Sequence, residues 1–296
     1  MANPKSPAWY GGGLSAALRP GANQGTVLYV NGAGPDTNDG LTPLTPLASF
    51  KAALALCTSQ LNDTIVVLDY WAAGTEDWPI VVDKEMVSII GCGVAGAPWP
   101  QVNPPGDTAA FSITAQGVEI AGLSINGGAA HGAIEIGASV WGTEIHHCWF
   151  GEAGTAQDGI RDVAPFDAIY LKIWGNRFGA GLTRNGVRID HNATRGMIGV
   201  PGLEPNVFHA PNDVCVYVNN EFAQGWICDN IFGLDSDVQG RAITLDATCV
   251  GGVTICGNRA HFGDTAMAQV PYLDSSAGGS NHWLLNYSGI VAVLPV

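Results

Sequence analysis

Short runs of apolar residues, each broken by Gly, Asn or Asp, follow one another along most of the chain. In runs such as TIVVLDYW, MVSIIGCG and RAITLDAT, apolar residues are either continuous or alternate with polar ones. Runs of this length between turn-forming residues predict β-strands. One segment, PLASFKAALALCTSQL, instead has apolar residues at the spacing of a helical face. They are Phe50, Leu54, Cys57 and Leu61. We therefore expect many short strands and one convincing helix over 49–61, capped by Thr45 or Ser49.

A phrase that ends in Phe recurs in the second half of the chain. Its versions are HHCWFG, WGNRFG, PNVFH, CDNIFG and CGNRAHFG, with Phe at positions 150, 178, 208, 232 and 262 and spacings of 28, 30, 24 and 30. A unit of about 27 residues that holds two or three short strands is typical of repeat architectures such as solenoids. Because the unit contains no helix and has Gly or Asn at its corners, we predict a β-solenoid.

An asparagine precedes the recurrent Phe by two residues in most units. These residues are Asn176, Asn206, Asn230 and, after a two-residue insertion, Asn258, whereas the first unit has Cys148. Equivalent positions in successive coils of a β-solenoid stack about 4.8 Å apart. Stacked amides can donate and accept along the column, and each hydrogen bond stabilises the fold by about 1 kcal/mol. We therefore expect an asparagine ladder at one corner, ending at Cys148.

This pattern, together with LYVNGAGPDTNDGLTPLTPLASFKAAL near the N-terminus, resembles the right-handed parallel β-helix superfamily, which has the pectate-lyase-like fold. The resemblance covers residues 27–267 and implies an all-β, right-handed parallel β-helix with a short N-terminal capping α-helix. It implies no single activity, because the fold carries lyases, hydrolases, epimerases and non-enzymatic spikes. We expect an extended N-terminal arm (1–26), a cap with the first coils (27–109), the β-helix coils (110–267) and a C-terminal cap or oligomerisation tail (268–296).

Composition and charge narrow the set of partners. Apolar residues make up 47% of the chain and charged residues 13%, and the net charge is −14. Nucleic-acid binding favours basic stripes, so we expect no nucleic-acid partner. No apolar run approaches the roughly 20 residues of a membrane span, and the N-terminus has no apolar signal-peptide core, so we expect neither a membrane partner nor export.

The seven cysteines form no CxxC pair. Cys215, Cys228 and Cys256 lie within apolar strand patterns. Such cysteines act as small core residues, so we expect reduced thiols and folding in the cytoplasm.

A second phrase also recurs in the repeat, as in GAIEIGAS and GVRIDHNA. One of its positions should face outward in every coil and so form a column on the surface. The residues at this position are Glu135, Arg161, Arg188, Tyr217 and Thr244. On adjacent coils Glu135 and Arg161 would form a cross-strand ion pair. An exposed pair of this kind contributes about 0–1 kcal/mol, and we favour this structural role over a catalytic arginine.

A catalytic alternative comes from AHGAIEIGAS and NGVRID, which partly resemble the GHG…IGS and R-I-K phrases of polygalacturonase-like hydrolases. The resemblance gives His131 and Arg188 as candidates, but Asp190 stands where that family has Lys. Glycoside hydrolysis needs two carboxyls about 5 to 9.5 Å apart. The acids that could supply such a pair are Asp158, Asp162, Asp167 and Asp190. Acids are equally expected at solenoid corners as turn formers, so we assign no catalytic residue.

Two acidic segments and one histidine pair are candidate metal sites. PDTNDG (35–40) and DSD (235–237) could bind Ca²⁺ through carboxylates and carbonyls, although a solvated turn is the favoured interpretation for both. His146 and His147 are adjacent, and successive residues of a strand point to opposite faces, so we expect no shared metal. The sequence therefore predicts neither a metal site nor a cofactor.

The position between Asn and Phe in the recurrent phrase should face outward. Its occupants are Trp149, Arg177, Val207 and Ile231. Large side chains on an outer wall suit a protein interface or a sugar-stacking surface, and loop cover over the wall is the equal alternative. Trp149, Arg177 and Ile231 are our candidate binding residues. Tryptophans that could extend this surface are Trp71, Trp78, Trp99 and Trp141.

Together these patterns favour a non-enzymatic virion structural protein of a bacteriophage: a β-helical spike, fibre or capsid decoration. We expect a homotrimer, assembled in the host cytoplasm into the virion with other virion proteins, and binding of surface polysaccharide as an additional role. The alternative is a polysaccharide lyase or glycoside hydrolase of the β-helix class, which depolymerase assays would reveal. A third hypothesis is a scaffold outside any virus, which the protein content of purified particles would separate from the first.

Overall fold

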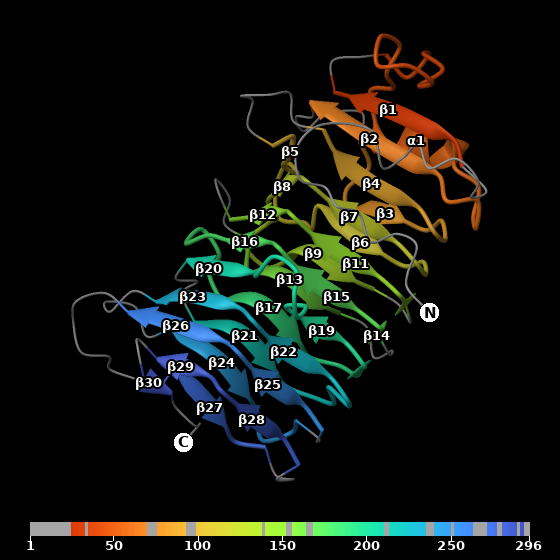
Figure 1. Ribbon diagram of the computed structural model, residues 1–296. Coiled ribbons are helices and arrows are strands. Elements are labelled where there is room, and N and C mark those ends of the chain that lie inside the picture. Colours follow the sequence, from red (N-terminus) through yellow and green to blue (C-terminus); the bar gives the residue numbers. More distant parts are fainter. Residues whose placement is uncertain are drawn as a thin grey trace.

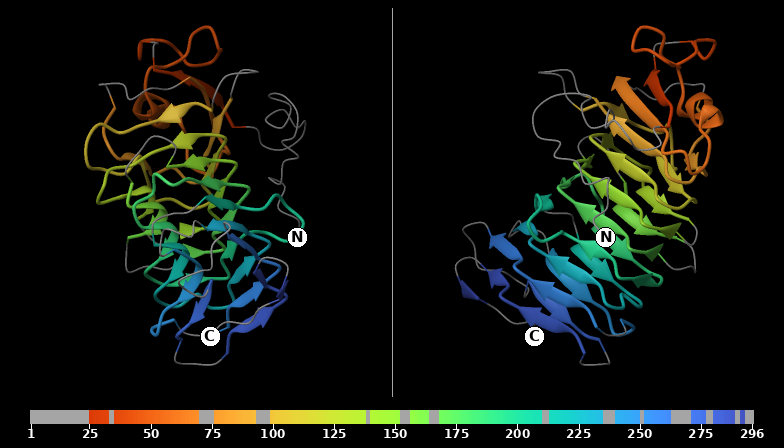
Figure 2. Two further views of the ribbon diagram at one scale, coloured as in Figure 1. Left: turned by 90° about the vertical axis from the view of Figure 1, so that its left-hand side faces the viewer. Right: turned by 45° about the vertical axis from the view of Figure 1, so that its right-hand side comes forward.

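The chain folds into a rod of stacked coils, as the computed structural model shows (Figures 1 and 2). The structure describes residues 25–32, 35–69, 76–92, 99–137, 140–151, 156–163, 168–209, 213–234, 240–249, 252–262, 271–276, 280–288 and 291–292. The predicted arm over 1–26 lies almost wholly outside the described residues. Among the described residues, no helix has the length and apolar character needed to cross a membrane.

Three long sheets form the walls of the rod, and all their strand pairs are parallel except β29 with β30. The ten-stranded sheet contains β1 (Val27–Asn31), β2 (Thr64–Asp69), β4 (Ser88–Gly91), β7 (Glu119–Ala121), β11 (Glu144–His146), β15 (Lys172–Trp174), β19 (Met197–Ile198), β22 (Trp226–Cys228), β25 (Thr254–Cys256) and β28 (His282–Leu284). The nine-stranded sheet contains β5 (Gln101–Val102), β8 (Ser124–Ile125), β12 (Trp149–Phe150), β16 (Arg177–Phe178), β20 (Val207–His209), β23 (Ile231–Leu234), β26 (Arg259–Phe262), β29 (Tyr287–Ser288) and β30 (Val291–Ala292).

The eight-stranded sheet contains β3 (Ile80–Val82), β6 (Phe111–Ile113), β9 (Gly132–Ile136), β13 (Asp158–Asp162), β17 (Asn185–Ile189), β21 (Val214–Val218), β24 (Arg241–Leu245) and β27 (Tyr272–Asp274). A three-stranded sheet of β10 (Val140–Trp141), β14 (Ala168–Ile169) and β18 (Ala193–Thr194) bridges one corner. One coil therefore runs β9, β10, β11 and β12 before β13 lies directly on β9 (Figure 1). This arrangement confirms the predicted all-β parallel β-helix.

The interior of the rod is built from columns of like residues, one from each coil. Phe150, Phe178, Phe208 and Phe232 are fully buried and stack face to face, with ring centroids 4.5–5.0 Å apart. The alignment of Phe262 with this column is wrong, because Ala260 pairs with Phe232 and Phe262 pairs with Leu234. The last coil therefore needs no insertion, and the spacing of its Phe misled the alignment.

The predicted asparagine ladder is present and fully buried at the corner before the nine-stranded sheet. The amide nitrogens of Asn176, Asn206 and Asn230 each donate to the side-chain oxygen of the next asparagine at 2.9–3.1 Å. Asn258 follows in direct register and donates to Asn286, a rung that the repeat alignment missed. The backbone N–H of Cys148 donates to Asn176 at 2.9 Å, so Cys148 ends the ladder as expected.

Left-handed backbone recurs at two corners of the coil. Two residues before strands of the ten-stranded sheet, φ lies between 55° and 88° at Met86, Gly117, Gly142, Tyr170, Arg195, Gln224 and Gly252. Immediately after strands of this sheet, φ lies between 51° and 78° at Gly122, His147, Gly175, Gly199, Asp229, Gly257 and Leu285. These residues turn the chain into and out of the ten-stranded wall. Side chains other than glycine at such corners are strained by about 1–2 kcal/mol per residue.

The one described helix, α1 (Phe50–Leu56), lies at the N-terminal end of the rod (Figure 1). Ser49 is its N-cap and accepts a hydrogen bond from the backbone N–H of Ala52, which settles the choice between Thr45 and Ser49. The buried Phe50 packs edge-on against Phe111 of the core, at 5.5 Å between ring centroids. The helix is shorter than the predicted 49–61, because the chain turns to extended backbone at Cys57.

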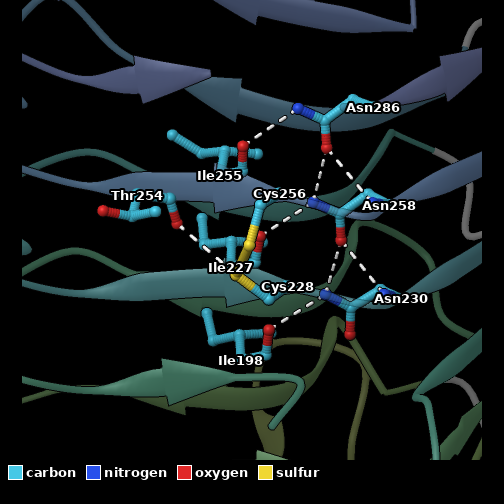
Figure 3. The surroundings of a disulfide bond; sticks show 9 residues. All are labelled: Ile198, Ile227, Cys228, Asn230, Thr254, Ile255, Cys256, Asn258 and Asn286. Carbon is cyan, nitrogen blue, oxygen red and sulfur yellow. Dashed lines mark hydrogen bonds between the residues drawn. A yellow bond between two sulfur atoms is a disulfide. The ribbon is translucent and has the colours of Figure 1, made fainter. Parts of the chain in front are cut away.

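One expectation about the cysteines is wrong. Cys228 and Cys256 occupy the same position in successive coils, on β22 and β25, and form a disulfide (Figure 3). The sequence pattern placed both in apolar strands but did not show that their side chains lie one above the other. The described free cysteines include Cys215, which is fully buried, as expected of a small core residue. Burial raises the pKa of the Cys215 thiol well above its ordinary value.

Candidate functional site

The candidate binding residues Trp149, Arg177 and Ile231 lie in one column on the outer face of the nine-stranded sheet. Trp149 pairs with Arg177, and Val207 separates Arg177 from Ile231. Trp99, which precedes β5, lies edge-on to Trp149 with ring centroids 5.6 Å apart. The guanidinium carbon of Arg177 lies 5.8 Å from the centre of the Trp99 ring, within the range of a cation–π contact. The column thus combines half-exposed indoles with an exposed cation.

Two other tryptophans proposed for this surface, Trp78 and Trp141, lie elsewhere. Trp141 is exposed on the three-stranded sheet, where its ring meets Tyr170 edge-on at 5.9 Å. Arg195, one coil further, donates to the Tyr170 hydroxyl at 2.7 Å. Trp78 is partly buried and packs against the core. Trp71 lies outside the described residues, and among the described ones of these four tryptophans Trp99 adds to the column.

The predicted ion pair on the outer face of the eight-stranded sheet forms, but it is less exposed than expected, since the side chains of Arg161 and Glu135 are 16% and 12% exposed. Glu135 and Arg161 are paired in register, and Nη2 of Arg161 donates to Oε1 of Glu135 at 2.6 Å. Nδ1 of His131 lies 3.0 Å from the same oxygen. His131 therefore contacts the Glu135 carboxylate, which Arg161 already neutralises. This contact explains the position of His131 without a catalytic role.

Arg188 and Tyr217 follow in the same column. The guanidinium of Arg188 lies over the Tyr217 ring, 4.5 Å from its centre, and its Nε donates to Asp190 at 2.5 Å. The Tyr217 hydroxyl donates to Oδ2 of Asp246 at 2.7 Å. Burial and the contact with Asp246 raise the pKa of Tyr217 to about 12. The sequence pattern placed these residues in a column but gave no sign of the Asp246 contact.

The acids considered as a catalytic pair have structural partners. Asp158 is fully buried and forms an ion pair with Arg184. Asp162 is buried and accepts hydrogen bonds from the backbone N–H groups of Asp190 and His191, at 2.5 and 2.8 Å. Burial raises the pKa of Asp162, and the negative charge of Asp190 adds to the effect. Asp167 lies outside the described residues.

The acidic turn 35–40 uses its carboxylates within the protein. Asp36 accepts from the backbone N–H of Ala48 and from the Ser49 hydroxyl, and Asp39 accepts from Leu41 N–H and the Thr45 hydroxyl. The second acidic segment, 235–237, lies outside the described residues. In the part of the chain that the structure describes, no group of three or more His, Cys, Asp or Glu side chains is arranged to hold a metal ion.

The expectation that His146 and His147 point to opposite faces is wrong. The strand ends at His146, and His147 adopts left-handed backbone with φ of 52°. This turn returns the second ring toward the first, so that the two Nδ1 atoms lie 2.8 Å apart. Burial lowers the pKa of His147, and the neighbouring His146 lowers it further.

Comparison of the chain with models of protein families, with curated proteins and with solved structures finds no match. The fold defines the class, a parallel β-helix protein, and the outer columns carry its candidate binding residues.

Proposed function

We propose that the chain is a non-enzymatic structural protein of a bacteriophage virion, a spike-type member of the pectate-lyase-like superfamily that binds surface polysaccharide. The observation that carries the proposal is the cluster of Trp99, Trp149 and Arg177 on the wall of a stiff rod. Indole faces stack on the C–H faces of sugars, and a guanidinium donates to sugar hydroxyls and carboxylates. Because the sheet fixes these side chains in advance, binding orders little that is mobile.

The virion setting is supported by the construction of the rod and by its disulfide. Buried ladders of Asn and Phe along successive coils suit a protein that must persist outside a cell. The disulfide between Cys228 and Cys256 agrees with exposure to an oxidising environment after assembly in the host cytoplasm. The proposed unit is a homotrimer that contacts other virion proteins, in a spike, fibre or capsid decoration.

The test of glycan binding is affinity electrophoresis of the purified chain against acidic and neutral polysaccharides. We expect retention by at least one polymer, and a loss of affinity of about tenfold in Trp149→Ala and in Arg177→Ala. Arg259→Ala is the matched control, because Arg259 is an exposed arginine of the same column that lies three strands beyond Arg177. Equal retention of the unmodified chain and the three variants would exclude the column as the binding surface.

The assembly is tested separately, by native mass spectrometry of the same preparation and by the protein content of purified particles. A mass of three chains is the expected result. A monomer at micromolar concentration would exclude a stable homotrimer, and absence from particles would favour a scaffold outside any virus.

One observation favours the second candidate, a glycan depolymerase. Asp162 is a buried acid with a raised pKa, next to Asp190 and on the same wall as His131 and Arg188. A buried carboxyl with a raised pKa is the kind of group that acts as a general acid in glycoside cleavage. Turnover of a polysaccharide that disappears in a folded Asp162→Asn variant would establish this function, and turnover that persists would exclude Asp162 as the acid.

A further inference from the structure

The two adjacent histidines form a paired unit at the corner between the ten-stranded and nine-stranded sheets. Their Nδ1 atoms lie 2.8 Å apart and their rings are inclined by 85°. His146 is buried and stacks on Trp174, with ring centroids 4.4 Å apart and planes inclined by 13°. The His147 ring meets the same indole edge-on at 4.7 Å. Trp174 thus holds both rings in place.

Each histidine has a carboxylate at its other nitrogen. Nε2 of His146 lies 3.0 Å from Oε1 of Glu119, and the second Glu119 oxygen accepts from the Ser88 hydroxyl at 2.7 Å. Nε2 of His147 lies 2.9 Å from Oε2 of Glu204. Each ring therefore has its Nε2 beside a carboxylate oxygen and its Nδ1 beside the Nδ1 of the other ring, 2.8 Å away. A neutral imidazole carries a lone pair on one of its two nitrogens, so both Nδ1 atoms can serve as ligands when the protons are on Nε2.

We propose that His146 and His147 bind one divalent transition-metal ion through their Nδ1 atoms. A histidine that ligates a metal almost always donates its other ring N–H to a carboxylate, carbonyl or water, and both rings have a carboxylate in this place. Metal–nitrogen bonds of about 2.0 Å that meet at a right angle place two nitrogens about 2.8 Å apart, which suits the tetragonal geometry of Cu²⁺ or Ni²⁺. The two imidazoles occupy adjacent positions, and water completes the coordination.

The position of the pair gives a metal ion access. The His147 side chain is 21% exposed and the Glu204 side chain 43% exposed, whereas His146 is closed off beneath them. The left-handed backbone of His147 is essential, because an extended residue would direct the second imidazole away from the first. Histidine tolerates this conformation better than most side chains, so the corner holds the ligand at modest strain.

The test is a titration of the chelator-treated chain with Cu²⁺ alone, followed by tryptophan fluorescence and electron paramagnetic resonance. We expect one ion per chain, quenching of Trp174 and a spectrum with two nitrogen ligands. His147→Asn keeps a residue that tolerates left-handed backbone and removes one ligand, so its affinity should fall at least about tenfold. Glu204→Gln should weaken binding by about tenfold, because it removes the charge that fixes the His147 ring.

Two controls keep the result specific. His131→Asn removes another histidine that contacts a carboxylate, on a different wall, and should bind Cu²⁺ like the unmodified chain. Trp174→Phe should lose the quenching while the resonance spectrum keeps its two nitrogens. Equal affinity of His147→Asn, with its fold verified by circular dichroism, would overturn the proposal. So would a ¹⁵N spectrum in which the two Nδ1 atoms share one proton that equimolar Cu²⁺ does not displace.

Discussion

At the scale of single residues, the buried asparagines determine how the coils stay in register. Asn230 donates to the Ile198 carbonyl and to Asn258, both at 2.9 Å, and accepts from Asn206 at 2.9 Å (Figure 3). An amide can donate to a strand carbonyl of the preceding coil and to the next rung at once, because it has two N–H donors and an acceptor. Each such asparagine therefore ties three successive coils together.

Replacement of one rung should be strongly destabilising. Asn230→Ala leaves the Ile198 carbonyl and the Asn206 amide without their partner in a fully buried site, so we expect the free energy of unfolding to fall by about 2–4 kcal/mol. Urea unfolding followed by circular dichroism gives this value. Cys148→Asn is the matched control, since it adds a rung at the end of the ladder, and we expect a change below about 1 kcal/mol. A loss in the control as large as in Asn230→Ala would contradict the ladder as the source of stability.

At the scale of the elements, the coil depends on corners that the strand pattern does not reveal. The backbone is left-handed before and after strands of the ten-stranded sheet, and the corners hold glycine in some coils and larger residues in others. Gly142 has φ of 71° and open space where a Cβ would lie. Gly91 differs, because a Cβ there would lie 1.9 Å from the Gly122 carbonyl oxygen of the next coil.

These two glycines separate backbone strain from steric overlap. Gly142→Ala should lower the free energy of unfolding by about 1–2 kcal/mol, through the left-handed backbone alone. Gly91→Ala should lower it by more, because two coils must move apart to admit the methyl group. Thermal unfolding of both variants measures the difference. Equal effects would mean that the coils adjust to the extra methyl group without loss of packing.

At the scale of the whole molecule, the disulfide joins two successive coils near the C-terminal end of the rod (Figure 3). The two cysteines are 28 residues apart in sequence, and closing a loop of this size stabilises a fold by about 3.6 kcal/mol in the chain-entropy description. The bond acts on a coil that the asparagine ladder already fixes through Asn230 and Asn258. It therefore reinforces the ladder and does not create the register.

Alkylation of the unfolded chain tests the disulfide. Without reductant we expect label on five of the seven cysteines, and after reduction on all seven. Reduction should also lower the free energy of unfolding by about 2–4 kcal/mol, and Cys228→Ser should show the same loss without reductant. The control Cys249→Ala removes a buried free cysteine and keeps the disulfide, so reduction should destabilise it as much as the unmodified chain. Seven labels without reductant would show that the two thiols remain reduced.

Much of the architecture could be predicted because it repeats. Four Phe residues and four Asn residues recur at similar spacings, and a recurring buried residue must stack on its counterpart when coils have nearly equal length. The ion pair between Glu135 and Arg161 followed from the same register. The error at Phe262 has the same origin, because alignment by residue type placed the last coil two residues out of register.

The sequence by itself determined the class of fold and the columns that line its core, since short apolar runs with a constant period can bury their side chains only by stacking coil on coil. Only the tertiary structure decided which polar groups meet at the corners. His147 turns back to His146 through left-handed backbone, and Cys228 reaches Cys256 across one coil spacing. Such contacts depend on backbone torsions and on the separation between coils, and neither quantity is encoded in the spacing of apolar residues.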